Sequence, residues 1–160
     1  MFTEGRQTMA SSWEKFEELI KAKMRTVYSE TVVELGMNPK NLGEVDDANG
    51  FARITGPCGD TMSIWLKIDG DIILDAGFTT DGCTTSLASA SMATLIAKGS
   101  RLEEAQKVSE QNILDALGGL PDESRHCALL AALPCLARAE SRRRSGYHSS
   151  RGEKLMSGRS

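Results

Sequence analysis

The feature that most constrains the fold is a pair of adjacent segments in which apolar and polar residues alternate. They span residues 62–68 and 72–79, and Asp69-Gly70 lies between them. Alternation with a period of two is typical of strands with one buried face, and Asp-Gly is a common tight hairpin turn. We therefore expect an antiparallel hairpin, with residues 51–57 as a third strand of the same sheet.

The segment before these strands follows the helical period instead. Ser11 and Glu14 form a capping box ahead of an apolar stripe with three-to-four-residue spacing. This stripe predicts one amphipathic helix, or a pair of helices, running to about Leu35. Gly36 and Pro39 then end it.

The segment after the strands also reads as helical. A helix is predicted to begin after Cys83 and to end at Lys98-Gly99, and residues 102–117 give one or two more. A last helix carries Cys127, with a kink or break near Pro134. The sequence thus predicts an α+β fold in which a small three-stranded antiparallel sheet is packed by about five helices.

Length and composition fit one compact domain over residues 12–141, preceded by a flexible N-terminus at 1–11 and followed by a disordered basic tail at 142–160. The chain has 160 residues, is 40% hydrophobic and carries a net charge of -3. This charge gives no reason to expect a nucleic-acid partner, and no apolar run approaches the roughly 18 residues of a membrane span. No secretory signal is recognisable, so we expect a reducing, cytoplasmic setting in which cysteines serve as metal ligands or redox groups.

Three of the four cysteines stand at turns or helix starts, next to other metal-binding side chains. These are Cys58 with Asp60, Cys83 after Gly82, and Cys127 with His126. Three thiols, a carboxylate and an imidazole exceed what a four-coordinate ion needs, and the spacing is unlike that of a zinc finger. We therefore predict a metal site at one exposed end of the fold, built from separate elements and able to exchange what it holds.

Each predicted ligand has a local geometric reason. Cys58 and Asp60 lie two residues apart at the entry to a strand, so both side chains project to the same face. Cys83 opens a helix, where the positive end of the helix dipole favours its thiolate. His126 and Cys127 are adjacent, so they converge only if His126 precedes the first regular turn, or they alternate as ligands.

Motifs for metal-dependent hydrolysis and for nucleotide binding are missing from the sequence. It contains no His-Glu-x-x-His, no phosphate-binding loop, no dinucleotide fingerprint and no serine nucleophile elbow. We therefore expect that the chain is not an enzyme. One enzymatic alternative stays open, a sulfurtransferase in which Cys83 or Cys127 carries a persulfide.

A series of short motifs is spread over most of the chain, from about residue 28 to about residue 140. They are Tyr28-Ser29-Glu30, Asn38-Pro39-Lys40-Asn41-Leu42-Gly43, Cys58-Gly59-Asp60, Ile73-Leu74-Asp75-Ala76-Gly77-Phe78, Gly82-Cys83, Ser89-Ala90-Ser91, Ala97-Lys98-Gly99, Gly119-Leu120-Pro121 and His126-Cys127. In this order they resemble the motifs of the NifU/IscU-type iron-sulfur cluster assembly scaffold family.

The resemblance implies a function for the cysteines. Cys58, Cys83 and Cys127 would be the cluster-binding thiolates, with Asp60 and His126 as exchangeable neighbours. Family members take sulfur from a cysteine desulfurase and iron from a donor, assemble a [2Fe-2S] cluster and pass it to apo iron-sulfur proteins. They can also hold zinc in the same site, and a homodimer is compatible with this function. The alternative is a stable zinc-binding module that modulates a cysteine desulfurase.

Three features depart from the family pattern. Cys83 is followed by the bulkier Thr84-Thr85-Ser86. Leu120-Pro121-Asp122-Glu123-Ser124 replaces the family's apolar and basic chaperone-recognition stretch, which speaks against dependence on an Hsp70-type chaperone. The fourth cysteine, Cys135, is covered by no motif and is expected to be a packing residue.

Overall fold

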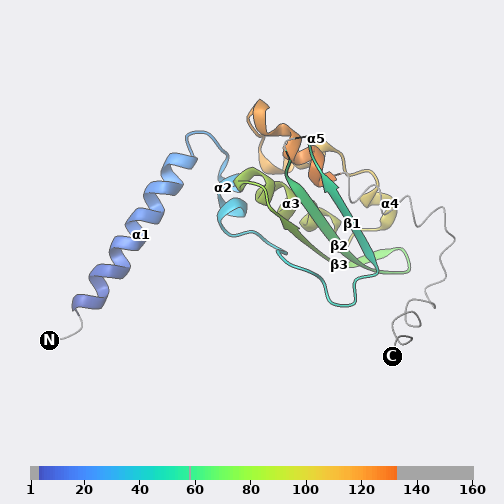
Figure 1. The fold of residues 1–160 in the computed structure, drawn as a ribbon, viewed down its shortest axis with the longest axis horizontal. Helices are drawn as coiled ribbons and strands as arrows, with labels where there is room; N and C mark the ends of the chain where they lie inside the picture. The colour runs from blue at the N-terminus through green and yellow to red at the C-terminus, as the bar shows by residue number, and fades with distance from the viewer. Residues whose placement is uncertain (1–3, 58, 133–160) are drawn as a thin grey trace.

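The computed structural model describes residues 4–57 and 59–132, and it has the predicted α+β architecture (Figure 1). A helical run at residues 125–132 follows the elements that carry labels. Those elements are α1 (Glu4–Met24), α2 (Glu30–Met37), β1 (Gly50–Thr55), β2 (Thr61–Asp69), β3 (Ile72–Thr80), α3 (Thr84–Ala97), α4 (Leu102–Ala105), α5 (Glu110–Leu117) and the 3-10 helix η1 (Asp122–Ser124).

The sheet confirms the prediction from alternation. Its strands are ordered β1-β2-β3 and both neighbouring pairs are antiparallel. β2 and β3 form the expected hairpin, in which Asp69 pairs with Ile72 and Gly70 has a φ of 58°. A positive φ is the conformation that such a tight turn requires and that glycine adopts without strain.

The core lies between the sheet and α3, which packs against β3, α2 and α5. On the β2 side it consists of the alternating residues Met62, Ile64, Leu66 and Ile68, each no more than 4% exposed. On the α3 side it consists largely of alanine, serine and threonine, whose small side chains let the helix lie close to its neighbours. This central position of α3 holds its first residues in a defined place at the end of β3.

The predicted apolar stripe before the sheet divides into two helices. The turn between α1 and α2 is stabilised by an ion pair between Arg25 and Glu30, with an Nε–Oε2 distance of 2.6 Å. α1 begins at Glu4, ahead of the predicted capping box at Ser11. Figure 1 shows α1 extending away from the rest of the fold.

Some predictions concern residues outside the described ranges. Cys58, Cys135, the expected break near Pro134 and the basic tail at 142–160 all fall there. Among the described residues, no helix is both long enough and apolar enough to cross a membrane.

Candidate functional site

Cys83 lies at the N-cap of α3 and its side chain is exposed. Partial burial raises the pKa of the Cys83 thiol. Hydrogen bonds from the Thr85 hydroxyl and from the backbone amides of Ser86 and Thr85 lower this pKa by a larger amount, so it lies below its ordinary value. The start of a helix supplies such unpaired amides and a positive partial charge. An exposed thiol with a lowered pKa is suited to binding a metal or accepting sulfur.

Cys127 lies close to Cys83 in the fold although it is distant in sequence. It belongs to the helical run at 125–132 and is only 1% exposed. The Thr85 hydroxyl lies between the two sulfur atoms, 3.0 Å from Sγ of Cys83 and 3.4 Å from Sγ of Cys127. One hydroxyl can donate to the first sulfur and accept from the second. The starts of two helices thus bring an exposed and a buried thiol to one place.

Asp60 joins this arrangement from the start of β2. Its Oδ2 lies 3.4 Å from the Ser86 hydroxyl, which in turn lies 3.4 Å from Sγ of Cys127. Gly82 packs against both residues, because a Cβ at this position would lie 2.6 Å from Cβ of Ser86 and 2.8 Å from Oδ2 of Asp60. A glycine before Cys83 is therefore needed for the carboxylate and the thiols to approach one another.

His126 is exposed at the edge of the same arrangement. Its Nε2 lies 3.6 Å from Sγ of Cys127, the neighbouring residue. The ring therefore folds back toward the sulfur despite the roughly 100° that separates successive helical side chains. His126 is the second residue of the helical run at 125–132 and lies within its first turn, so the expected requirement that it precede that turn is not met, although its ring still reaches the sulfur.

The structure thus relates four of the five predicted site residues through short contacts, while Cys58 falls outside the described residues. Within residues 4–57 and 59–132, no three or more histidine, cysteine, aspartate or glutamate side chains are close enough together to hold a metal ion. The complete ligand set therefore remains a prediction. Its donor chemistry suits the implied cargo, because thiolates with one imidazole or carboxylate are ligands of zinc and of iron-sulfur clusters.

Thr85 and Ser86 are site residues that the sequence does not indicate. In the sequence they are only bulkier residues after Cys83, whereas in the structure both are fully buried and hydrogen-bonded to sulfur. A local signal existed, since they occupy the second and third residues of a helix whose N-cap is Cys83. What the sequence lacks is the tertiary contact that places Cys127 against them.

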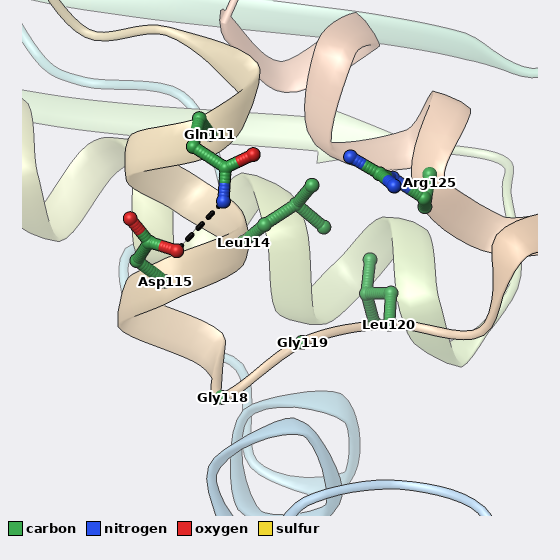
Figure 2. Close-up of a pocket in the computed structure, with 7 residues that line it drawn as sticks. All are labelled: Gln111, Leu114, Asp115, Gly118, Gly119, Leu120 and Arg125. Carbon is green, nitrogen blue, oxygen red and sulfur yellow. Dashed lines mark hydrogen bonds between the residues drawn. The ribbon is translucent and has the colours of Figure 1, made fainter.

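A separate pocket lies beside the segment that leads to His126 (Figure 2). Its volume is about 500 Å³, and it lies between α5, the Gly118-Gly119 turn and Arg125. The hydrogen bond drawn there joins Gln111 Nε2 to Asp115 Oδ1 at 2.7 Å. Neither Cys83 nor Cys127 lines it, so it is distinct from the thiol site.

Comparison with known proteins supports the family resemblance and the fold. The "Iron-sulfur cluster assembly scaffold protein IscU 1" of Archaeoglobus fulgidus is 43% identical over 107 residues, which cover 66% of this chain and 70% of that protein. The "Iron-sulfur cluster assembly scaffold protein IscU" of Aquifex aeolicus is 38% identical over 106 residues, covering 64% and 68% respectively.

Solved structures show the same fold. The N-terminal part of a NifU-like protein from Brucella abortus superposes with a TM-score of 0.61, covering 74% of this chain and 96% of that one at 17% identity. The family described as "NifU-like N terminal domain" matches residues 27–140. These residues include every predicted ligand and exclude all of α1. The chain therefore belongs to the NifU-like N-terminal domain family.

Proposed function

We propose that this protein is a scaffold on which a [2Fe-2S] cluster is assembled and from which the cluster passes to apo iron-sulfur proteins. The observation that carries the proposal is the Thr85 hydroxyl between the sulfur atoms of Cys83 and Cys127, in a family whose relatives bear the name scaffold. In this proposal Cys58, Cys83 and Cys127 bind the cluster, and Asp60 and His126 are its exchangeable neighbours.

The difference in exposure between the two thiols supports a division of roles. Cys83 is exposed and has a lowered pKa, so its thiolate can attack the terminal sulfur of a persulfide on a cysteine desulfurase. The S–S bond breaks, Cys83 keeps the sulfur and the desulfurase cysteine leaves as a thiolate. An electron donor then supplies the electrons that convert this sulfur to sulfide.

Cys127 and Asp60 serve the other side of the cluster. Cys127 is buried beneath Thr85 and Ser86, so it forms the inner wall, and an acceptor protein approaches from the Cys83 side. A carboxylate oxygen is a weaker partner for iron of an iron-sulfur cluster than a thiolate. Asp60 in that position keeps the cluster labile enough to leave, and the protein acts as a carrier rather than as an enzyme.

The proposed partners follow from this function. They are a cysteine desulfurase, an iron donor and apo iron-sulfur proteins, in the cytoplasm. η1 places Asp122 and Glu123 directly before the helical run with His126 and Cys127. This acidic segment replaces the apolar and basic chaperone motif, which supports independence from an Hsp70-type chaperone.

A stable zinc module is the second candidate. The observation that favours it is that the hydroxyl groups of Thr85 and Ser86 contact the thiols and hold them close together. Zinc would use the same thiolates with Asp60 or His126 as the fourth ligand. In this role the protein would modulate a desulfurase without building a cluster.

Anaerobic reconstitution with iron, cysteine, a reductant and a cysteine desulfurase tests the proposal. We expect the visible absorbance and circular dichroism of a [2Fe-2S] centre, followed by its transfer to an apo-ferredoxin. Cys58→Ala, Cys83→Ala and Cys127→Ala should each lose the signal, whereas Cys135→Ala, the matched control, should keep it. A colourless protein that retains one zinc per chain contradicts the scaffold and supports the zinc module, and persulfide transfer without iron supports a sulfurtransferase.

A further inference from the structure

α1 carries large apolar side chains that the rest of the described chain does not cover. No other helix or strand among the described residues packs along it, and it extends into solvent in Figure 1. It also lies outside the residues that the family shares, which begin at residue 27. The exposed side chains are Trp13 (66%), Phe16 (53%), Leu19 (69%) and Ile20 (38%).

These side chains lie on neighbouring parts of one helix face. At 100° per residue, Trp13, Phe16 and Ile20 fall within about 60° of one another, and the Trp13 and Phe16 rings contact with centroids 5.8 Å apart. Isolated helices are marginal in water and gain most of their stability from packing such a face. An amphipathic helix without a covering surface therefore indicates an interaction site.

The charges beside this face are segregated along the helix. Lys21 Nζ lies 3.0 Å from Glu17 and 3.8 Å from Glu18, and Arg25 Nη1 lies 3.8 Å from Glu18. These contacts place the four residues, with Glu14 one turn earlier, on one edge of the helix. Acidic groups therefore occupy the first half of this edge, and basic groups occupy the second half.

We propose that α1 docks antiparallel against α1 of a second copy of this chain. In an antiparallel helix pair related by a two-fold axis, the same edge of both helices meets. With Leu19 and Ile20 near the axis, Glu14 and Glu18 of one copy face Arg25 and Lys21 of the other. A parallel pair would instead place this edge against the opposite one, which carries Ser12 and Lys23.

The segregation of charge along this edge also argues against other occupants. A membrane surface favours a helix whose polar face is basic along its length, whereas half of this edge is acidic. Folding back onto the chain's own sheet would break the helical bonds that continue at Arg25 and Tyr28 and the Arg25–Glu30 ion pair.

This dimer would leave the thiol sites accessible. α1 is about 32 Å long, and each folded body follows the C-terminal end of its own α1. In an antiparallel pair the two bodies therefore lie at opposite ends. A single helix pair buries an area at the small end of the range for specific interfaces. We therefore expect a reversible dimer with a dissociation constant on the order of micromolar.

Sedimentation velocity of the full-length, metal-free protein under reducing conditions tests this proposal. Wild-type protein should shift from monomer to dimer with rising concentration. Phe16→Glu should weaken the dimer by about tenfold or more, whereas Leu95→Glu, a matched change of an exposed leucine on α3, should leave it unchanged. A protein that is monomeric at every concentration, or a dimer that Phe16→Glu does not weaken, overturns the proposal.

A charge exchange tests the antiparallel arrangement. Glu14→Lys with Glu18→Lys makes basic the two positions that face Arg25 and Lys21 of the other copy, and Lys21→Glu with Arg25→Glu makes acidic the two positions that face Glu18 and Glu14. Each double variant alone should dimerise more weakly than wild type, while their equimolar mixture should dimerise more strongly than either. A mixture no stronger than its components contradicts the pairing. Because the assay contains no metal or sulfur donor, its outcome is independent of the scaffold function.

Discussion

Replacing Gly82 by alanine tests whether close packing before Cys83 holds the site together. Gly82 is not in the left-handed conformation that disfavours side chains, so the added methyl group acts through contacts alone. Those contacts are with Ser86 and Asp60, the two residues that link the carboxylate to Cys127.

The expected magnitude follows from the distances. The new Cβ would lie 2.6 Å from Cβ of Ser86 and 2.8 Å from Oδ2 of Asp60, whereas ordinary contact begins at 3.4 Å. These two neighbours must therefore move by about 0.6–0.8 Å and the still closer Ser86 hydroxyl by more, and overpacking of this kind costs about 1–3 kcal/mol of unfolding free energy. Ser86 is fully buried in the first turn of α3, so it cannot rotate away freely. Displacing groups that orient the ligands should also weaken zinc binding by roughly tenfold or more.

Urea denaturation of the metal-free protein and chelator competition for zinc measure these two effects. Gly99→Ala is the control, because Gly99 follows the far end of α3, has a φ of +82° and has no atom within 4 Å of the added Cβ. Its strain should cost about 1–2 kcal/mol while zinc affinity stays at the wild-type value. If Gly82→Ala leaves both quantities at wild-type values, the site is not packed as described.

Two further predictions concern Cys83 and Ser29. Because the folded-state pKa of Cys83 is lowered, its thiolate stabilises the metal-free protein at pH above the unfolded-state pKa, and this contribution is lost as pH falls through the folded-state pKa. The free energy of unfolding should therefore rise with pH more in wild type than in Cys83→Ser, and parallel pH profiles in urea denaturation would refute this. Ser29 caps α2, accepting from the Val32 amide at 3.2 Å, and donates to the Leu117 carbonyl of α5. Ser29→Ala should destabilise the protein by about 1–2 kcal/mol in thermal or urea unfolding, and an unchanged midpoint would show that this link contributes nothing.

The sheet and the central helix were predictable because their signals are local. Alternation in residues 62–68 and 72–79 and the Asp69-Gly70 turn identify the hairpin without any tertiary information. Cys83 is the residue before α3, as the change of period indicated. The division into α1 and α2 was less definite, since the apolar spacing continues through the turn at 25–29, where Arg25 pairs with Glu30.

The sequence predicted a set of ligand residues for the site but not which of them are buried. Motif order indicated Cys83, Cys127, Asp60 and His126, and the structure relates these four through short contacts. The order of the motifs could not indicate that Cys127 is buried while Cys83 is exposed. Burial of Cys127 depends on its contact with Thr85 and Ser86, which are about forty residues away in the sequence. Exposure of the apolar face of α1 was likewise hidden, since an amphipathic pattern alone does not say whether its partner is in the same chain.

Zinc K-edge X-ray absorption of the zinc-loaded full-length protein tests most directly whether one site gathers the three cysteines. We expect three sulfur ligands at about 2.3 Å and one nitrogen or oxygen ligand at about 2.0–2.1 Å. Cys58→Ala, Cys83→Ala and Cys127→Ala should each lose one sulfur ligand or the metal, and Cys135→Ala should change nothing. A spectrum with two or fewer sulfur ligands in the wild type would contradict the three-cysteine site.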